Sequence, residues 1–247
     1  MIVVVNAENR RLFEADLIQM YRQRKTVFVD REGWKIPVVA DQEIDGYDRE
    51  DTIYLLSKEE LDGPLLASVR LLPTMRPHLM GDLFPAICRD APPHGPNVWE
   101  VSRFCTTPDL PGRGIRLALL WEIICGVMET ALLYGIERVI FVANRALLPL
   151  ALTCGWEVRK LGETLPHENG EVTAATAVMS PAGLRRVRQY HGVSIPAIRF
   201  HASTPHRGRD RFEPAVDGQR RTVLSHGQAA PVQQHMQITS TGDLAHG

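Results

Sequence analysis

The chain has 247 residues, and its 44% hydrophobic content is enough for a real core without disulfides. Its 28 basic and 29 acidic side chains nearly cancel, so composition does not favour nucleic acid or an anionic membrane as a partner. The four cysteines lack the paired spacing of a zinc site, and we interpret them as reduced thiols without a metal. The N-terminus does not resemble a signal peptide, and Glu122 and Glu129 interrupt the most apolar helix. We therefore expect a soluble cytoplasmic protein with no membrane insertion.

The first part of the chain predicts strands, one helix and one irregular segment. Residues 2–5 are typical of a strand, and residues 8–24 show mostly helical spacing of apolar side chains. Residues 24–51 mix aromatic and acidic side chains without a period, and long irregular segments in compact domains are usually functional or mobile. Residues 52–57 and 65–72 then predict two strands joined by a turn.

The second part predicts a short helical turn at residues 79–84 and then alternates strands with helices. The predicted strands are residues 98–105, 138–143, 156–161 and 172–179. The predicted helices are residues 115–134, closed by Gly135, then 145–153 and 181–190. The arginines of the last helix suit a solvated face. Residues 196–247 are polar and aperiodic, as is typical of a disordered tail, so we expect a single domain over residues 1–195.

The strand at residues 98–105 carries a charge on each face. With a period of two, one face has Val98, Glu100, Ser102 and Phe104, and the other has Trp99, Val101, Arg103 and Cys105. A charge in a half-buried strand costs several kcal/mol unless it is paired, so Glu100 and Arg103 each imply a partner. Structural ion pairs would meet this requirement as well as a functional site would.

Several motifs lie in order along the first 190 residues. They are Arg24-x-x-x-Phe28 with Gly33-Trp34, Glu43-x-Asp45-x-x-Asp48, Arg70-Leu-Leu-Pro-Thr, Phe84-Pro and Trp99-Glu100-x-Ser102-Arg103-Phe104. In order and spacing they closely resemble the LuxI-type acyl-homoserine-lactone (autoinducer) synthases.

This resemblance implies a fold and a reaction. The fold would be α/β (α+β) and similar to the GNAT N-acyltransferases: a twisted, mostly antiparallel sheet flanked by helices in three layers, with central strands splaying to admit a pantetheine arm. The reaction would make a quorum-sensing signal. The α-amine of S-adenosylmethionine would attack an acyl thioester, and lactonisation would then release methylthioadenosine. S-adenosylmethionine would be a co-substrate, so we expect no cofactor.

The motif residues suit this chemistry. We predict Glu100 and Arg103 as catalytic residues, because the ammonium nucleophile must lose a proton and a carboxylate in a partly dry strand can accept it. The residues predicted to bind S-adenosylmethionine or to order the N-terminal region over it are Arg24, Phe28, Trp34, Asp45, Asp48, Arg70, Phe84, Ser102 and Phe104. Aromatic faces and carboxylates suit its cationic groups, and Arg103 or Ser102 suits its carboxylate. For Asp48 and Arg70, a purely structural ion pair is the alternative.

Either acyl-carrier protein or acyl-coenzyme A could donate the acyl group. Residues 145–153 carry Pro149 and Thr153 where basic side chains would suit an acidic carrier protein, which favours coenzyme A with its diphosphate at Gly112 and Gly114. Basic residues 138, 159 and 160 could form a carrier-protein patch instead. Ala143, which lacks the hydroxyl found in family members making 3-oxo products, predicts an unsubstituted acyl chain.

Two other functions fit the same fold. A generic GNAT acyltransferase acting on another amine would not need Arg24, Phe28, Trp34 and the Asp45/Asp48 pair. A non-catalytic ligand-binding domain would bind without releasing methylthioadenosine.

Overall fold

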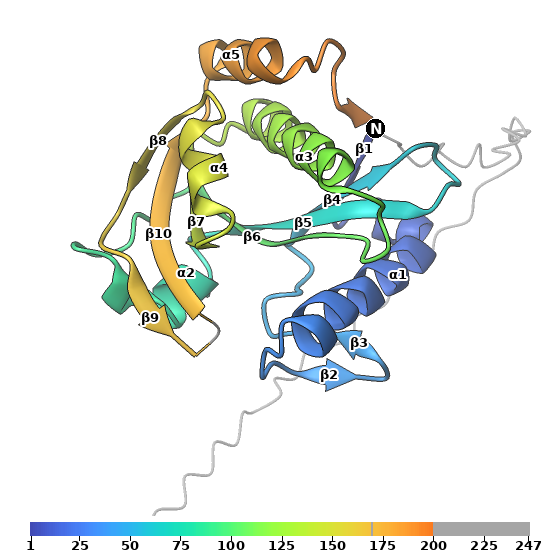
Figure 1. The fold of residues 1–247 in the computed structure, drawn as a ribbon, viewed down its shortest axis with the longest axis horizontal. Helices are drawn as coiled ribbons and strands as arrows, with labels where there is room; N and C mark the ends of the chain where they lie inside the picture. The colour runs from blue at the N-terminus through green and yellow to red at the C-terminus, as the bar shows by residue number, and fades with distance from the viewer. Residues whose placement is uncertain (169, 200–247) are drawn as a thin grey trace, which may run out of the picture. The chain divides into compact units, whose positions relative to one another are not determined.

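A computed structural model describes residues 1–168 and 170–199 as helices packed on both faces of one twisted sheet (Figure 1). The sheet order is β11-β1-β4-β5-β6-β7-β10-β8, and β9 pairs with β10. Its strands are β1 (Ile2–Val5), β4 (Ile53–Lys58), β5 (Leu65–Pro73), β6 (Val98–Thr106), β7 (Arg138–Asn144), β8 (Glu157–Lys160), β9 (Leu165–His167), β10 (Gly170–Val178) and β11 (Ile198–Arg199). The helices are α1 (Glu14–Arg24), α2 (Leu79–Asp82), α3 (Arg113–Tyr134), α4 (Leu148–Thr153) and α5 (Pro181–His191). Most neighbouring strands are antiparallel, which confirms the expected three-layer fold.

Alternate residues of the strands are buried on opposite faces. In β1, Ile2 and Val4 face the core beneath α3, whereas Val3 and Val5 face the core beneath α1. Figure 1 shows α3 and α5 on one side of the sheet and α1 on the other. Because both faces are covered, a polar side chain on either face of the central strands must find its partners inside the protein.

α3 is the helix of the described residues that is long and apolar enough to span a membrane by length and composition. Here it packs on the sheet through side chains such as Ile123, Val127 and Met128, all of which are buried. It ends at Gly135, whose positive φ of 69° closes the last turn, as predicted. Packing against the sheet therefore accounts for its apolar composition.

The sheet opens between β6 and β7. These strands are parallel and pair only from Val98 to Glu100, although β6 continues to Thr106 and β7 to Asn144. Beyond Glu100 the two strands no longer share a ladder, so backbone groups on their facing edges are available to other partners. This agrees with the expected splay.

The simple alternation predicted for residues 98–105 is wrong at its C-terminal end. The register of β5 against β6 shifts by one residue between Arg70↔Ser102 and Ser68↔Cys105, and Arg103 has a positive φ of 56° within this bulge. As a result, the side chains of Ser102, Arg103 and Cys105 lie on the same face of the sheet, opposite α3. Phe104 instead packs against the core under α3.

The segment predicted to be irregular, residues 24–51, holds three defined elements. The helix of α1 continues directly into a π-helix at Lys25–Arg31, and a small hairpin follows from β2 (Val38–Val39) and β3 (Gln42–Glu43). Short π-helical segments are rare and occur often at functional sites. They lack the apolar periodicity of an α-helix, which is why the sequence pattern disappears here.

Two predictions for the C-terminal part also need correction. β11 pairs in parallel with β1, so ordered structure continues beyond the predicted boundary at residue 195. Arg188 is not part of a solvated face, because it donates to the buried carboxylate of Glu129 at 2.7 Å. The rest of the predicted tail, residues 200–247, lies outside the described residues.

Candidate functional site

A cluster of charged side chains lies between β5, β6 and the segment after α1. Its members, which we call the charged cluster, are Arg24, Glu43, Asp45, Asp48, Arg70 and Arg103. Three guanidinium groups face three carboxylates, and each of these side chains is at most 9% exposed. The cluster is therefore electrically balanced within itself.

Arg24 ties the end of α1 to the loop after the hairpin. It is fully buried, contacts Glu43 and donates to both oxygens of Asp48 at 2.8 and 2.9 Å. Burial alone would raise the pKa of Asp48, but the hydrogen bonds and charge of Arg24, with the charge of Arg70, hold it below its usual range. Asp48 is therefore ionised at neutral pH.

Arg70 connects this loop to the sheet. Its guanidinium donates to Asp45 at 2.6 Å and to Asp48 at 2.9 Å, and its Nε donates to the Ser102 hydroxyl at 3.1 Å. The structure therefore pairs Arg70 with both aspartates of the predicted Asp45/Asp48 motif. Since Arg70 is fully buried, removing either acid would leave the charged cluster with one uncompensated positive charge.

Arg103 reaches the cluster because of the bulge in β6. Its Nη2 donates to Glu43 at 3.1 Å and to Asp45 at 2.8 Å. Its guanidinium carbon lies 5.7 Å from the ring centre of Phe28 and 5.9 Å from that of Trp34, and these two rings stack at 4.7 Å. The structure therefore brings together two aromatic rings, a guanidinium and carboxylates, as the sequence predicted.

Glu100 lies on β6 beside the charged cluster. Its Oε1 accepts the Met80 N–H at 3.0 Å, at the start of α2, while its Oε2 is buried without a hydrogen-bond partner among the described residues. Burial raises the pKa of Glu100 to about 7, although the backbone N–H groups of Met80 and Leu79 and the charges of Arg70 and Arg103 oppose the shift. A carboxylate with a pKa near neutrality and one unpaired oxygen is suited to accept a proton.

Two residues of the site were not predicted as binding residues. Glu43 was part of a motif only, yet it is fully buried and bridges Arg24 and Arg103. Tyr54 donates its hydroxyl to Asp48 at 2.8 Å from the next strand, β4. The spacing of Glu43 from Asp45 could have pointed to the former, whereas a tyrosine in an apolar strand gives no signal.

The two predicted phenylalanines take different places. Phe84 packs beside Met80 and Ile87 and lies 5.1 Å from the His167 ring, on the side of the sheet that carries Glu100. Phe104 belongs to the α3 side and so does not share a face with Ser102, contrary to the prediction.

The predicted acyl-donor residues are separate from the charged cluster. Gly112 has φ of 82° and caps the N-terminus of α3, and a Cβ at Gly112 or Gly114 would meet nothing within 4 Å. The backbone of this turn is therefore open in front of free helix N–H groups. Ala143 is buried in β7 and pairs with Thr173.

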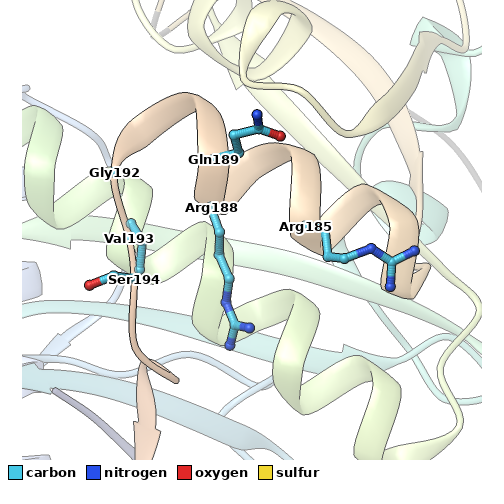
Figure 2. Close-up of a pocket in the computed structure, with 6 residues that line it drawn as sticks. All are labelled: Arg185, Arg188, Gln189, Gly192, Val193 and Ser194. Atoms are coloured by element: carbon cyan, nitrogen blue, oxygen red, sulfur yellow. The ribbon is translucent and has the colours of Figure 1, made fainter.

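A surface depression of about 330 Å³ lies elsewhere, at the end of α5. Figure 2 shows that its arginines do not converge: Arg188 extends toward α3, while Arg185 points along α5. Because Arg188 is paired with Glu129, this depression offers little for a charged ligand. The chemistry of the molecule is concentrated at the charged cluster and Glu100.

Comparisons with known proteins agree with this site. The family model described as autoinducer synthase matches residues 8–187. An isovaleryl-homoserine lactone synthase of Bradyrhizobium diazoefficiens is 35% identical over 71% of this chain and 78% of its own length. The solved CoA-dependent acyl-homoserine lactone synthase BjaI, with SAM and isopentyl-CoA, superposes with a TM-score of 0.74 at 30% identity, over 82% of this chain and 94% of its own.

A more distant match supports the fold alone. An N-acetyltransferase structure from Lactobacillus plantarum superposes with a TM-score of 0.50 at 17% identity, covering 73% of this chain and 98% of its own.

Proposed function

The chain belongs to the autoinducer synthase family, and from this premise we propose how its site makes an N-acyl-L-homoserine lactone. It is an acyltransferase that uses S-adenosylmethionine and an acyl thioester and releases methylthioadenosine. The observation that carries the mechanism is the buried Glu100 with its unpaired Oε2.

Glu100 is the general base of the first step. The α-ammonium of S-adenosylmethionine gives a proton to the Glu100 carboxylate, directly or through water, and the free amine attacks the thioester carbonyl. The C–N bond forms, the C–S bond breaks, and the carrier leaves as a thiol. Backbone N–H groups where β6 and β7 separate are suited to stabilise the oxyanion.

The second step closes the lactone within the acylated intermediate. A carboxylate oxygen attacks the carbon attached to the sulfonium, and methylthioadenosine leaves with the electron pair of the broken C–S bond. In this proposal Arg103 holds the carboxylate, while Phe28 and Trp34 offer ring faces to the cationic part of the ligand. S-adenosylmethionine is consumed, so the reaction needs no resident cofactor.

We propose acyl-coenzyme A as the acyl donor. α4 has the sequence Leu-Pro-Leu-Ala-Leu-Thr and no basic side chain to meet an acidic carrier protein, and the turn at Gly112 is open for a diphosphate. The similar BjaI is CoA-dependent. Both substrates are soluble metabolites, which fits the cytoplasm as the location.

We also propose an unsubstituted acyl chain. Ala143 offers no hydroxyl, and the neighbouring hydroxyl of Thr173 lies 2.7 Å from that of Thr164. A dominant 3-oxo product would contradict this.

One assay tests the whole proposal. The purified protein is mixed with S-adenosylmethionine and the same acyl group on coenzyme A and on acyl-carrier protein, including an isovaleryl pair. Methylthioadenosine and lactone are then followed together by mass spectrometry. We expect equal amounts of both products, with higher kcat/KM for acyl-coenzyme A. Acylation of another amine without methylthioadenosine would support the generic acyltransferase, and binding without products would support a non-catalytic domain.

A further inference from the structure

Arg31 links the N-terminal segment to the turn before α3. It is the last residue of the π-helix, and its Nη1 donates to the Pro108 carbonyl oxygen at 2.9 Å. Its Nη2 donates to Asp109 at 3.1 Å. This turn leads into Gly112 and Gly114, the predicted acyl-donor residues.

This pair has little value for stability. The Arg31 side chain is 49% exposed and that of Asp109 is 90% exposed, and ion pairs in such surroundings contribute little to folding. Arg31 is nevertheless held at two points, on a carbonyl and on a carboxylate of the same turn. Its position is therefore better explained by what the turn binds.

Electrostatic repulsion between Asp109 and a bound phosphate explains why a guanidinium lies at this turn. A carboxylate at the head of a phosphate-binding turn repels the phosphate, and Asp109 stands only three residues before Gly112. Arg31 neutralises that carboxylate. Exposed Arg113 and Arg116 at the start of α3 add further positive charge, and Arg116 also donates to the Leu110 carbonyl oxygen at 3.2 Å. Arg113 and Arg116 against Asp109 leave a net charge of +1 at the turn, and Arg31 raises this to +2, which strengthens the attraction for a phosphate.

We propose that Arg31 determines affinity for the acyl donor by neutralising Asp109 and facing the phosphate end of the pantetheine arm. This inference rests on the proposed function, since it needs a pantetheine thioester. Both coenzyme A and acyl-carrier protein attach that arm through a phosphate, so the inference does not depend on which of them is used. Because Arg31 and Phe28 both belong to the π-helix, this helix would contribute to the sites of both substrates.

The two members of the pair should respond with opposite signs. Removing the positive charge in Arg31→Ala leaves Asp109 free to repel phosphate, and we expect the KM for the acyl donor to rise about tenfold. Removing the negative charge in Asp109→Asn should leave that KM unchanged or lower it. The double variant should return most of the way to the starting value. The KM for S-adenosylmethionine and kcat should change less than about twofold throughout.

The experiment measures steady-state kinetics for both acyl-coenzyme A and acyl-carrier protein with these variants. Arg22→Ala, an exposed arginine on α1, is the matched control and should have no effect. If Arg31→Ala and Asp109→Asn both raise the donor KM, the pair is only a structural tie and the proposal is wrong. No change in either variant would also overturn it. If the protein turns over only the acyl-carrier-protein thioester, the proposal of acyl-coenzyme A as donor fails. The opposite changes in donor KM expected for Arg31→Ala and Asp109→Asn still test the role of Arg31.

Discussion

At the scale of single residues, the proposed role of Glu100 requires a buried carboxylate, and ionising that carboxylate lowers the stability of the folded state. Glu100 is 1% exposed, and its raised pKa means that the folded protein binds a proton that the unfolded chain has already released. Between its ordinary pKa and about 7, the folded state therefore loses stability as pH rises. In the proposed mechanism, this uncompensated oxygen is the base of the first step, which accounts for its presence in the core.

The first prediction concerns the pH dependence of turnover. Because the base must be ionised, kcat/KM for S-adenosylmethionine should rise with pH and level off above about 7, the pKa of Glu100. Glu100→Gln should bind S-adenosylmethionine and lose turnover by about 100-fold or more at every pH. A substituted protein that keeps its turnover would remove Glu100 from the mechanism.

The same substitution makes a prediction about stability. Glu100→Gln removes the ionisation, so its free energy of unfolding should no longer fall from pH 5 to pH 8 as strongly as in the parent protein. We expect the parent to lose up to about 3 kcal/mol more than the variant over that range. Urea denaturation at the two pH values measures the difference, and identical pH profiles would mean that the Glu100 pKa is not raised.

Tyr54 carries a third prediction. Tyr54→Phe keeps the ring but removes the hydroxyl bonded to Asp48, and we expect the free energy of unfolding to fall by about 1–2 kcal/mol. Because Asp48 holds Arg24 and Arg70, the KM for S-adenosylmethionine should rise while that for the acyl donor stays unchanged. Tyr21→Phe is the matched control, because it removes a hydroxyl that lies 3.0 Å from that of Tyr54 but keeps the ring over which Arg24 lies. Equal kinetic effects of the two changes would contradict a specific role for Tyr54.

At the scale of elements, the spacing of apolar side chains predicts where regular strands and helices lie. It does not predict features that depend on how one strand pairs with another. The strands at residues 2–5 and 138–143 are visible because apolar side chains make them up. The bulge at Arg103 is not visible, because it arises from the register against Ser68 and Arg70 in another strand. The π-helix was not predicted for a related reason: its turns do not repeat with the apolar spacing of an α-helix.

The candidate site follows the same rule. Glu100 and Arg103 were found because a charge in a half-buried strand requires a partner, and Arg70 because it belongs to one of the motifs. Tyr54 was missed because a hydroxyl at the end of a ring has no such cost until its neighbours are known. Both cases show that sequence reasoning detects unusual charges more easily than ordinary polar contacts.

One close approach between elements makes a prediction of its own. A Cβ on Gly162, just after β8, would lie 2.1 Å from the Ile87 carbonyl oxygen. Gly162→Ala must therefore displace backbone, and we expect a loss of about 2 kcal/mol or more. Gly46→Ala, where a Cβ meets nothing within 4 Å, should change stability by less than about 1 kcal/mol. Thermal unfolding of both variants compares them, and equal melting temperatures would contradict the close contact.

At the scale of the whole molecule, the two ends of the described chain close one edge of the sheet. β11 pairs with β1, and the Ile2 N–H donates to the Ala197 carbonyl oxygen at 2.7 Å. The buried Glu129 of α3 anchors this segment by accepting the Ala197 and Ile198 N–H groups at 2.9 and 3.0 Å, together with Arg188. One carboxylate thus joins α3, α5 and the end of the sheet.

The last prediction uses this anchor. A chain that ends after Ile195 leaves Glu129 buried with only Arg188, so its free energy of unfolding should fall by about 3 kcal/mol relative to a chain that ends after Arg199. The longer truncation keeps every contact that β11 makes within the described residues and is therefore the matched control. Hydrogen exchange at the Ile2 amide should be fast in the shorter chain and slow in the longer one, because its acceptor is Ala197. Equal exchange in the two proteins would show that β11 does not hold this edge, and that pairing with β4 and packing in the two cores are enough to hold β1.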